Sequence, residues 1–337
     1  MKAAKIAGIV LGVVVVVIAA GIGYLYQAFP KVPPAADIAV AGTPEQIARG
    51  AYLANHVTIC IDCHSTREFD YYSGPADLST AGKGGQIFSE EMGFPGSIPA
   101  SNITPVKLSS WTDGEIMRAV TSGVSKDGTP LFPIMPYPEY NALSEPDVNS
   151  LVAYLRTLAP LENEPPARHL NFPLNLIVRL MPMPYVAKAH PDTSNKLEYG
   201  KYLSTIAGCK FCHTPMVEGQ PVPEMAFAGG QEFPMPGFGV STSMNITPDA
   251  DTGVGGWDLQ TFIEIFRSYS PEEVRSAPLG PDDPRTDMPW SMYSGMTDSD
   301  LEAIYTFLMS LEPIASSHDR WTPEKVMDET VDQTLKE

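Results

Sequence analysis

The motif C-x-x-C-H occurs twice in this chain, and it constrains the fold more than any other feature. The copies lie at Cys60–His64 and Cys209–His213 and use all four cysteines. Two thiols at this spacing can reach the two vinyl-derived carbons of one porphyrin, and the histidine that follows then ligates the iron. The sequence therefore predicts two covalently bound haem c groups, attached through Cys60, Cys63, Cys209 and Cys212, with His64 and His213 as axial iron ligands.

Disulfides and zinc are the alternative uses of four cysteines. Exported proteins form disulfides, and four cysteines allow three pairings. A zinc site needs four ligands and would have to combine both pairs across a long separation. Neither alternative explains why a histidine follows each pair directly. The doubled motif favours haem.

The N-terminal segment is apolar and long enough to cross a bilayer. The stretch Ile6–Tyr26 is uncharged and would form a helix about 30 Å long. Tyr24 and Tyr26 stand where an interfacial aromatic belt is expected. A cleaved signal peptide is the alternative, but the run is long for one and Ala19-Ala20 is a weak cleavage site. We expect a retained single-pass anchor in the bacterial inner membrane, with the rest of the chain in the periplasm.

Charge and composition argue against a nucleic-acid partner and indicate how helices and loops alternate in the fold. The net charge is −18, which argues against nucleic acid, because phosphate binding needs a basic face. The acidic surface serves solubility or steers a basic partner. The chain has 33 prolines and 27 glycines, which favours short helices separated by long ordered loops.

The two halves of the chain repeat the same motifs in the same order. The shift between copies stays between 143 and 153 residues, which indicates two duplicated domains rather than a solenoid. The repeated segments are Gly50–Leu53 and Gly200–Leu203, Gly84–Gln86 and Gly229–Gln231, Asn102–Pro105 and Asn245–Pro248, Trp111-Thr112 and Trp257-Asp258, and Met135–Tyr140 and Met288–Tyr293.

The first and last helices of each half are expected to cross at a glycine. Thr43, Asn195, Ser144 and Thr297 are capping residues at the predicted helix starts. A glycine inside a helix costs roughly 1 kcal/mol relative to alanine, and a close helix crossing would explain its use. The pattern predicts that Gly50 lies beside Tyr154 or Leu155, and Gly200 beside Tyr305 or Phe307.

The second axial ligand of each haem is predicted from the repeat. Low-spin haem iron commonly takes methionine or histidine in that position. Of 15 methionines, only Met135 and Met288 match between the halves, each before proline and an aromatic residue. An ordinary core methionine is the alternative. The unmatched Met-Pro pairs at Met181, Met183 and Met235, and the histidines His56, His169, His190 and His318, are interpreted as packing, surface or structural residues.

Two Asn-Ile-Thr-Pro segments lie between haem attachment and the methionine. Asn102, Thr104, Asn245 and Thr247 are candidate haem-loop contacts. Holding the loop itself explains such a turn equally well. Trp111 and Trp257 are expected to pack against the macrocycle or the core.

From about Pro44 to Leu311, this order of motifs resembles the cytochrome c subunits of bacterial membrane-bound alcohol and aldehyde dehydrogenase complexes. The resemblance implies class I cytochrome c folds, His/Met ligation and electron transfer from a dehydrogenase toward quinone or a terminal oxidase. Such subunits often carry three haem domains, whereas this chain has two motifs. The chain is also similar to other anchored periplasmic dihaem cytochromes that feed oxidases.

We therefore expect a mainly α protein with a transmembrane helix followed by two tandem class I cytochrome c domains. It would carry electrons between a dehydrogenase, or a quinol-oxidising complex, and an acceptor such as a terminal oxidase. A catalytic dihaem enzyme of the cytochrome c peroxidase type is the alternative, and an assembly subunit with structural haems is a third. The apolar stretch Phe172–Val186 would pack between the domains or lie against a partner or the membrane. The expected segments are an anchor (1–30), a tether (31–42), haem domain 1 (43–165), a linker (166–192), haem domain 2 (193–313) and an acidic tail (314–337).

Overall fold

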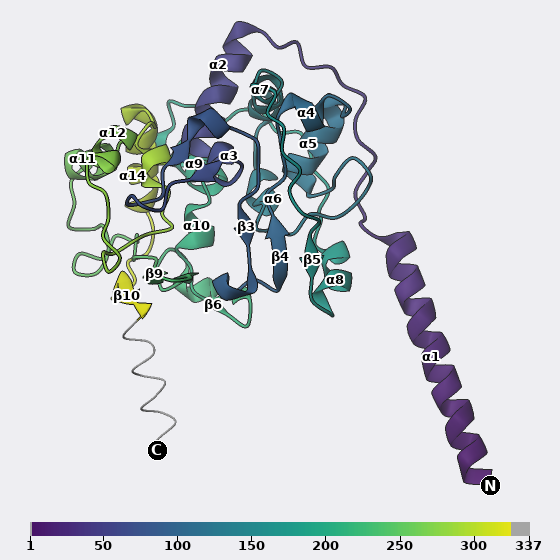
Figure 1. The fold of residues 1–337 in the computed structure, drawn as a ribbon. Helices are drawn as coiled ribbons and strands as arrows, with labels where there is room; N and C mark the ends of the chain where they lie inside the picture. Colours follow the sequence, from purple (N-terminus) through teal and green to yellow (C-terminus); the bar gives the residue numbers. More distant parts are fainter. Residues whose placement is uncertain (1, 325–337) are drawn as a thin grey trace, which may run out of the picture.

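The computed structural model describes residues 2–324 and shows a mainly helical body with one projecting helix (Figure 1). Met1 and most of the predicted acidic tail, residues 325–337, lie outside the described residues. The projecting helix is α1, Lys2–Ala28, and none of its residues is buried. By length and composition α1 could cross a membrane, as expected, although a signal sequence would have the same properties.

The two halves of the body share most of their helices, in the same order (Figure 1). The first half contains α2 (Pro44–Tyr52), the π-helix η1 (Leu53–Val57), α3 (Cys60–Cys63), α4 (Pro105–Leu108), α5 (Asp113–Ser122), α6 (Tyr137–Tyr140) and α7 (Glu145–Leu155). The second half contains α9 (Lys196–Ile206), α10 (Cys209–Cys212), α11 (Leu259–Arg267), α12 (Pro271–Arg275), α13 (Trp290–Tyr293) and α14 (Asp298–Leu308). Between the halves lie α8 (Leu174–Ile177) and the 3-10 turn η4 (Val178–Leu180).

The predicted helix starts are confirmed by their caps. Thr43 forms a full capping box with Gln46 at the start of α2. Asn195, Ser144 and Thr297 each accept a hydrogen bond from a backbone N–H in the first turn of their helices. These bonds satisfy backbone donors that a helix leaves open at its N-terminus.

The predicted crossings of first and last helices are also confirmed. A Cβ atom added to Gly50 would lie 1.8 Å from the Ser150 carbonyl oxygen of α7 and 2.7 Å from Cβ of Tyr154. A Cβ on Gly200 would lie 1.8 Å from the Ala303 oxygen of α14 and 3.0 Å from Cβ of Phe307. Each helix pair therefore approaches at a distance that only glycine permits.

Short antiparallel sheets, which the sequence patterns do not predict, complete each half. In the first half, β4 (Gly96–Pro99) pairs with β3 (Ile87–Phe88) and β5 (His169–Leu170). In the second half, β9 (Gly239–Thr242) pairs with β8 (Glu232–Met235) and β10 (Trp321–Pro323). Two hairpins add β1 (Thr66–Arg67) with β2 (Ala76–Asp77), and β6 (Met216–Val217) with β7 (Gln220–Pro221). The remaining 3-10 turns are η2 (Leu78–Thr80), η3 (Glu90–Met92) and η5 (Pro223–Met225).

The predicted linker and the predicted tail each contribute a strand to the half that precedes them. Strand β5 follows α7 and pairs with β4 of the first half, and strand β10 follows α14 and pairs with β9 of the second half. The strands are too short for alternating hydrophobicity to reveal them. The domain boundaries at 165 and 313 stay predictions. Strands β5 and β10 lie beyond these positions and still pair with the preceding half.

Reciprocal hydrogen bonds join the two halves. The Tyr52 hydroxyl donates to Asp300 at 2.7 Å, and the Tyr202 hydroxyl donates to Asp147 at 2.6 Å. Tyr52 and Tyr202 are repeat equivalents, as are Asp147 and Asp300, so each half donates to the other from the same position. Most of the buried apolar residues of both halves also form one continuous cluster.

Candidate haem-binding centres

Each C-x-x-C segment forms a single helical turn that begins after a residue in the left-handed conformation. The turns are α3 and α10, and the preceding residues are Ile59, with φ of 44°, and Gly208, with φ of 71°. Residues three apart lie on one face of a helical turn, so the two sulfurs of each motif point to the same side. All four thiols are free and half-buried.

The histidine of each motif is held by a backbone carbonyl. Nδ1 of His64 lies 2.6 Å from the Ser101 oxygen, and Nδ1 of His213 lies 2.6 Å from the Met244 oxygen. A carbonyl only accepts, so Nδ1 carries the proton and Nε2 is the nitrogen that can ligate a metal. Desolvation lowers the pKa of both imidazoles, which favours the neutral ring that ligation requires.

The two Asn-Ile-Thr-Pro loops hold these carbonyls in place. Asn102 donates to the Leu161 oxygen at 2.8 Å and accepts from the Thr104 backbone and hydroxyl. Asn245 and Thr247 repeat the arrangement against Ile314.

Asn102, Thr104, Asn245 and Thr247 are all buried. Their bonds favour the loop-holding interpretation, and direct haem contact by these residues stays a prediction. Ser101 and Met244 were not identifiable from the sequence, because a backbone carbonyl has no residue signature.

The segments that carry Met135 and Met288 are tied to the start of the haem motifs. Tyr140 donates to the Thr58 oxygen, two residues before the first motif. Tyr293 donates to the Ala207 oxygen at 2.5 Å, two residues before the second. Each tyrosine lies five residues after its methionine, so the structure joins each predicted axial-ligand segment to the predicted attachment segment of the same half. The methionines' role as iron ligands stays a prediction.

A buried charge cluster links the first motif to the methionine segment of the second half. The Arg67 guanidinium lies 3.5 Å from Asp62, which is inside the first motif, and 3.8 Å from Asp287, which precedes Met288. Ser73 also donates to the Met288 oxygen at 2.8 Å. Desolvation raises the pKa of both carboxyls, and the arginine opposes that rise. Sequence reasoning missed this cluster, since Arg67 and Asp287 are far apart in the chain and have no repeat equivalents.

The surroundings of the cysteines favour haem over zinc. Burial raises the pKa of the Cys63, Cys209 and Cys212 thiols to about 12, so without a metal these thiols are neutral. Among residues 2–324, no group of three or more His, Cys, Asp and Glu side chains converges as a metal site would require. A thioether link to porphyrin needs no ionised sulfur in the finished protein. The residues therefore fit haem c, with Nε2 of each motif histidine available for iron.

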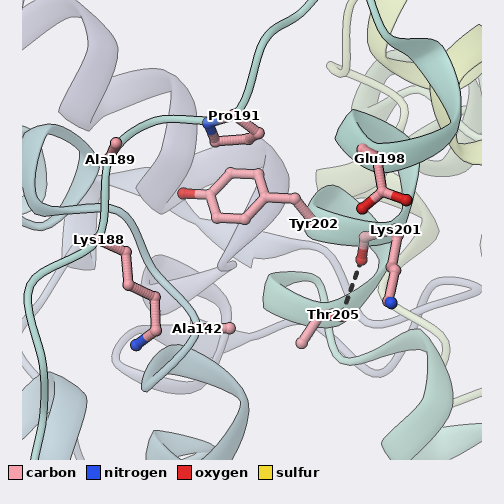
Figure 2. A pocket seen from close by; sticks show the side chains of 8 residues that line it. All are labelled: Ala142, Lys188, Ala189, Pro191, Glu198, Lys201, Tyr202 and Thr205. Atoms are coloured by element: carbon pink, nitrogen blue, oxygen red, sulfur yellow. Dashed lines mark hydrogen bonds between the residues drawn. The ribbon is translucent and has the colours of Figure 1, made fainter.

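A separate pocket lies between the end of the linker and α9 (Figure 2). The Tyr202 ring crosses it, with Lys188, Ala189 and Pro191 on one side and Glu198 and Lys201 on the other. None of its lining residues belongs to either haem motif, and the pocket is not part of the candidate centres.

A mainly helical chain with two C-x-x-C-H turns, each histidine oriented by a carbonyl, has the features of a c-type cytochrome. The chain is 29% identical over 308 residues to the cytochrome c subunit of the quinone alcohol dehydrogenase of Gluconacetobacter polyoxogenes, matching 85% of this chain and 61% of that protein. It is 29% identical over 287 residues to the fructose dehydrogenase cytochrome subunit of Gluconobacter japonicus, matching 80% and 54%. A diheme cytochrome c-type protein of Cereibacter sphaeroides is 28% identical over 165 residues, which is 46% of this chain and 53% of that protein.

These relatives confirm the resemblance predicted from the motifs. They are named as cytochrome subunits of dehydrogenases, which agrees with an electron-transfer protein rather than an enzyme. The chain spans little more than half the length of the dehydrogenase cytochrome subunits it matches. No family model matches the chain.

Proposed function

We propose that this chain is a membrane-anchored dihaem cytochrome c that takes electrons from a dehydrogenase or a quinol-oxidising complex. It passes them to a downstream acceptor such as a terminal oxidase. The observation that carries the proposal is the identical orientation of His64 and His213, each through Nδ1 at 2.6 Å from a carbonyl. The names of the relatives support a dehydrogenase as donor.

In this proposal the body forms two tandem class I cytochrome c domains. Cys60, Cys63, Cys209 and Cys212 attach two haem c groups, and His64, Met135, His213 and Met288 ligate the irons. When bound, haem supplies an iron that changes between ferrous and ferric states. The buried helices exclude water around it, and the carbonyls keep each imidazole neutral and oriented.

The location of the two centres supports electron passage between them. The Arg67 guanidinium lies 3.5 Å from Asp62, inside the first motif, and 3.8 Å from Asp287, next to Met288 of the second half. The first motif therefore lies close to the predicted axial-ligand segment of the other half. Helix α1 is proposed to keep the body beside the inner membrane, on the periplasmic side.

The competing proposal is a dihaem peroxidase, which needs one haem with an open or displaceable position. The matching methionine segments, tied down in the same way by Tyr140 and Tyr293, argue against an open position.

The test is the optical and EPR spectrum of the purified haem-loaded chain, with carbon monoxide and hydrogen peroxide added. Two low-spin haems that are inert to both reagents are expected. Replacing Met135 or Met288 by alanine should convert one haem to a form that binds carbon monoxide. Met183→Ala is the matched control, because it alters an unrepeated Met-Pro pair. A wild-type haem that binds carbon monoxide or consumes peroxide would favour the peroxidase.

A further inference from the structure

The segment between the two halves combines a buried apolar side chain with several exposed ones. Val178 is 1% exposed and packs with Ile98 and Leu170 in a small cluster of its own. The exposed fraction is 79% for Phe172, 41% for Ile177, 49% for Leu180 and 70% for Val186. We call these four exposed side chains the linker face.

Helix α8, which carries Ile177, lies beside the end of α1 (Figure 1). The Arg179 guanidinium donates to the Phe29 oxygen at 2.9 Å and to the Tyr26 oxygen at 3.2 Å. It also lies 4.5 Å from the centre of the Tyr26 ring, in a cation–π contact. The last carbonyls of a helix have no partner within the helix, so Arg179 caps α1 from the linker.

This contact determines the depth of the linker relative to a bilayer. If α1 spans the membrane, Tyr24 and Tyr26 occupy the boundary between hydrocarbon and water, where such rings are enriched. Residues held against Tyr26 and Phe29 then lie at the same level.

The charge of this segment fits a lipid surface. Residues 165–191 contain no aspartate or glutamate, although the whole chain carries a net charge of −18. The basic side chains in this range are Arg168, Arg179 and Lys188. Apolar side chains flanked by basic ones, without acidic neighbours, are typical of segments that lie in the headgroup layer.

We propose that the linker face is a second membrane contact, which lies in the lipid headgroup layer next to α1. This inference rests on the proposed retention of α1 as an anchor. The contact orients the body, because a single helix alone leaves it free to rotate and tilt on the tether. The two halves then keep a defined height above the bilayer.

The test is photocrosslinking of the full haem-loaded chain in nanodiscs of phosphatidylethanolamine and phosphatidylglycerol that contain a diazirine lipid. Lipid adducts are mapped by mass spectrometry. Adducts are expected in the peptide that covers Phe172–Val186 and in α1, whereas α2, on the opposite side of the body in Figure 1, should have none. Leu180→Glu should lower the linker adducts severalfold and leave those of α1 unchanged. Met309→Glu, at a similarly exposed apolar residue of the second half, is the matched control.

The outcomes separate this inference from the proposed anchor. Adducts in α1 without adducts in the linker would overturn the second contact and leave the anchor standing. Absence of adducts from both would overturn the anchor and the inference with it. Linker adducts as abundant in Leu180→Glu as in the wild type would also overturn the inference, because the linker face would then not make the lipid contact.

Discussion

Replacing Gly50 by alanine tests the helix crossing directly, because two physical effects would change the free energy of unfolding in opposite directions. Gly50 lies inside α2 with ordinary helical backbone angles, so alanine would favour the helix by about 1 kcal/mol. The new Cβ would, however, lie 1.8 Å from the Ser150 oxygen and 2.5 Å from its carbonyl carbon. Both atoms belong to the backbone of α7, which cannot move aside as a side chain can.

The clash should decide the result. Overpacking of a tight contact costs about 1–3 kcal/mol, and a backbone neighbour places this site at or above the upper end. After the gain in helix propensity, we expect Gly50→Ala to lower the free energy of unfolding by about 2 kcal/mol or more. Gly200→Ala should behave alike, since its Cβ would lie 1.8 Å from the Ala303 oxygen.

Denaturant titration of the haem-loaded chain, followed by far-UV circular dichroism, measures the change as a shift of the midpoint at constant slope. Ala48→Gly is the control, because Ala48 is exposed on the same helix and should report propensity alone, a loss of about 1 kcal/mol. A Gly50→Ala variant as stable as the wild type, or more stable, would refute the close crossing.

Three further substitutions test a hydrogen bond between the halves, the loop that holds His64, and a buried carboxyl group. Tyr52→Phe removes the bond to the buried Asp300 carboxylate and should cost about 1.5–3 kcal/mol in denaturant titration; an unchanged midpoint would show that the halves do not depend on this bond. Asn102→Ala leaves buried partners unpaired and loosens the carbonyl that holds His64, so spectroelectrochemical titration should show one haem potential shifted and the other unchanged. Burial raises the pKa of Glu139, whose Oε2 has no partner within residues 2–324, so folding favours its protonated form. Glu139→Gln should therefore raise the free energy of unfolding at neutral pH, and the advantage should disappear as pH falls below the unfolded value of about 4.3; equal stability at neutral pH would contradict this.

Local features of the fold were predictable from the sequence because their causes are local. Thr43 and Ser144 cap helices through bonds to residues three positions later, so the pattern is visible in a few letters. The crossings at Gly50 and Gly200 were predictable for a different reason. A glycine inside each first helix needs an explanation, and the repeat supplies the partner helix twice.

The short strands and the contacts between the halves were not predictable in the same way. Strands β5 and β10 are two and three residues long, and only pairing with β4 and β9 defines them. The bonds from Tyr52 to Asp300 and from Tyr202 to Asp147 join residues far apart in the chain. No local pattern marks such partners, because their pairing depends on how the halves pack.

The predicted haem attachment depends on residues that are adjacent in the chain, whereas the surroundings of each motif depend on the tertiary fold. The attachment signature of haem c places two thiols and a histidine within five residues, so it can be recognised in the sequence alone. The orientation of that histidine depends on Ser101 and Met244, whose backbone carbonyls reach it only when distant loops fold back. The position of Arg67 between Asp62 and Asp287 likewise exists only in the folded chain, because burial brings those charges together across the two halves.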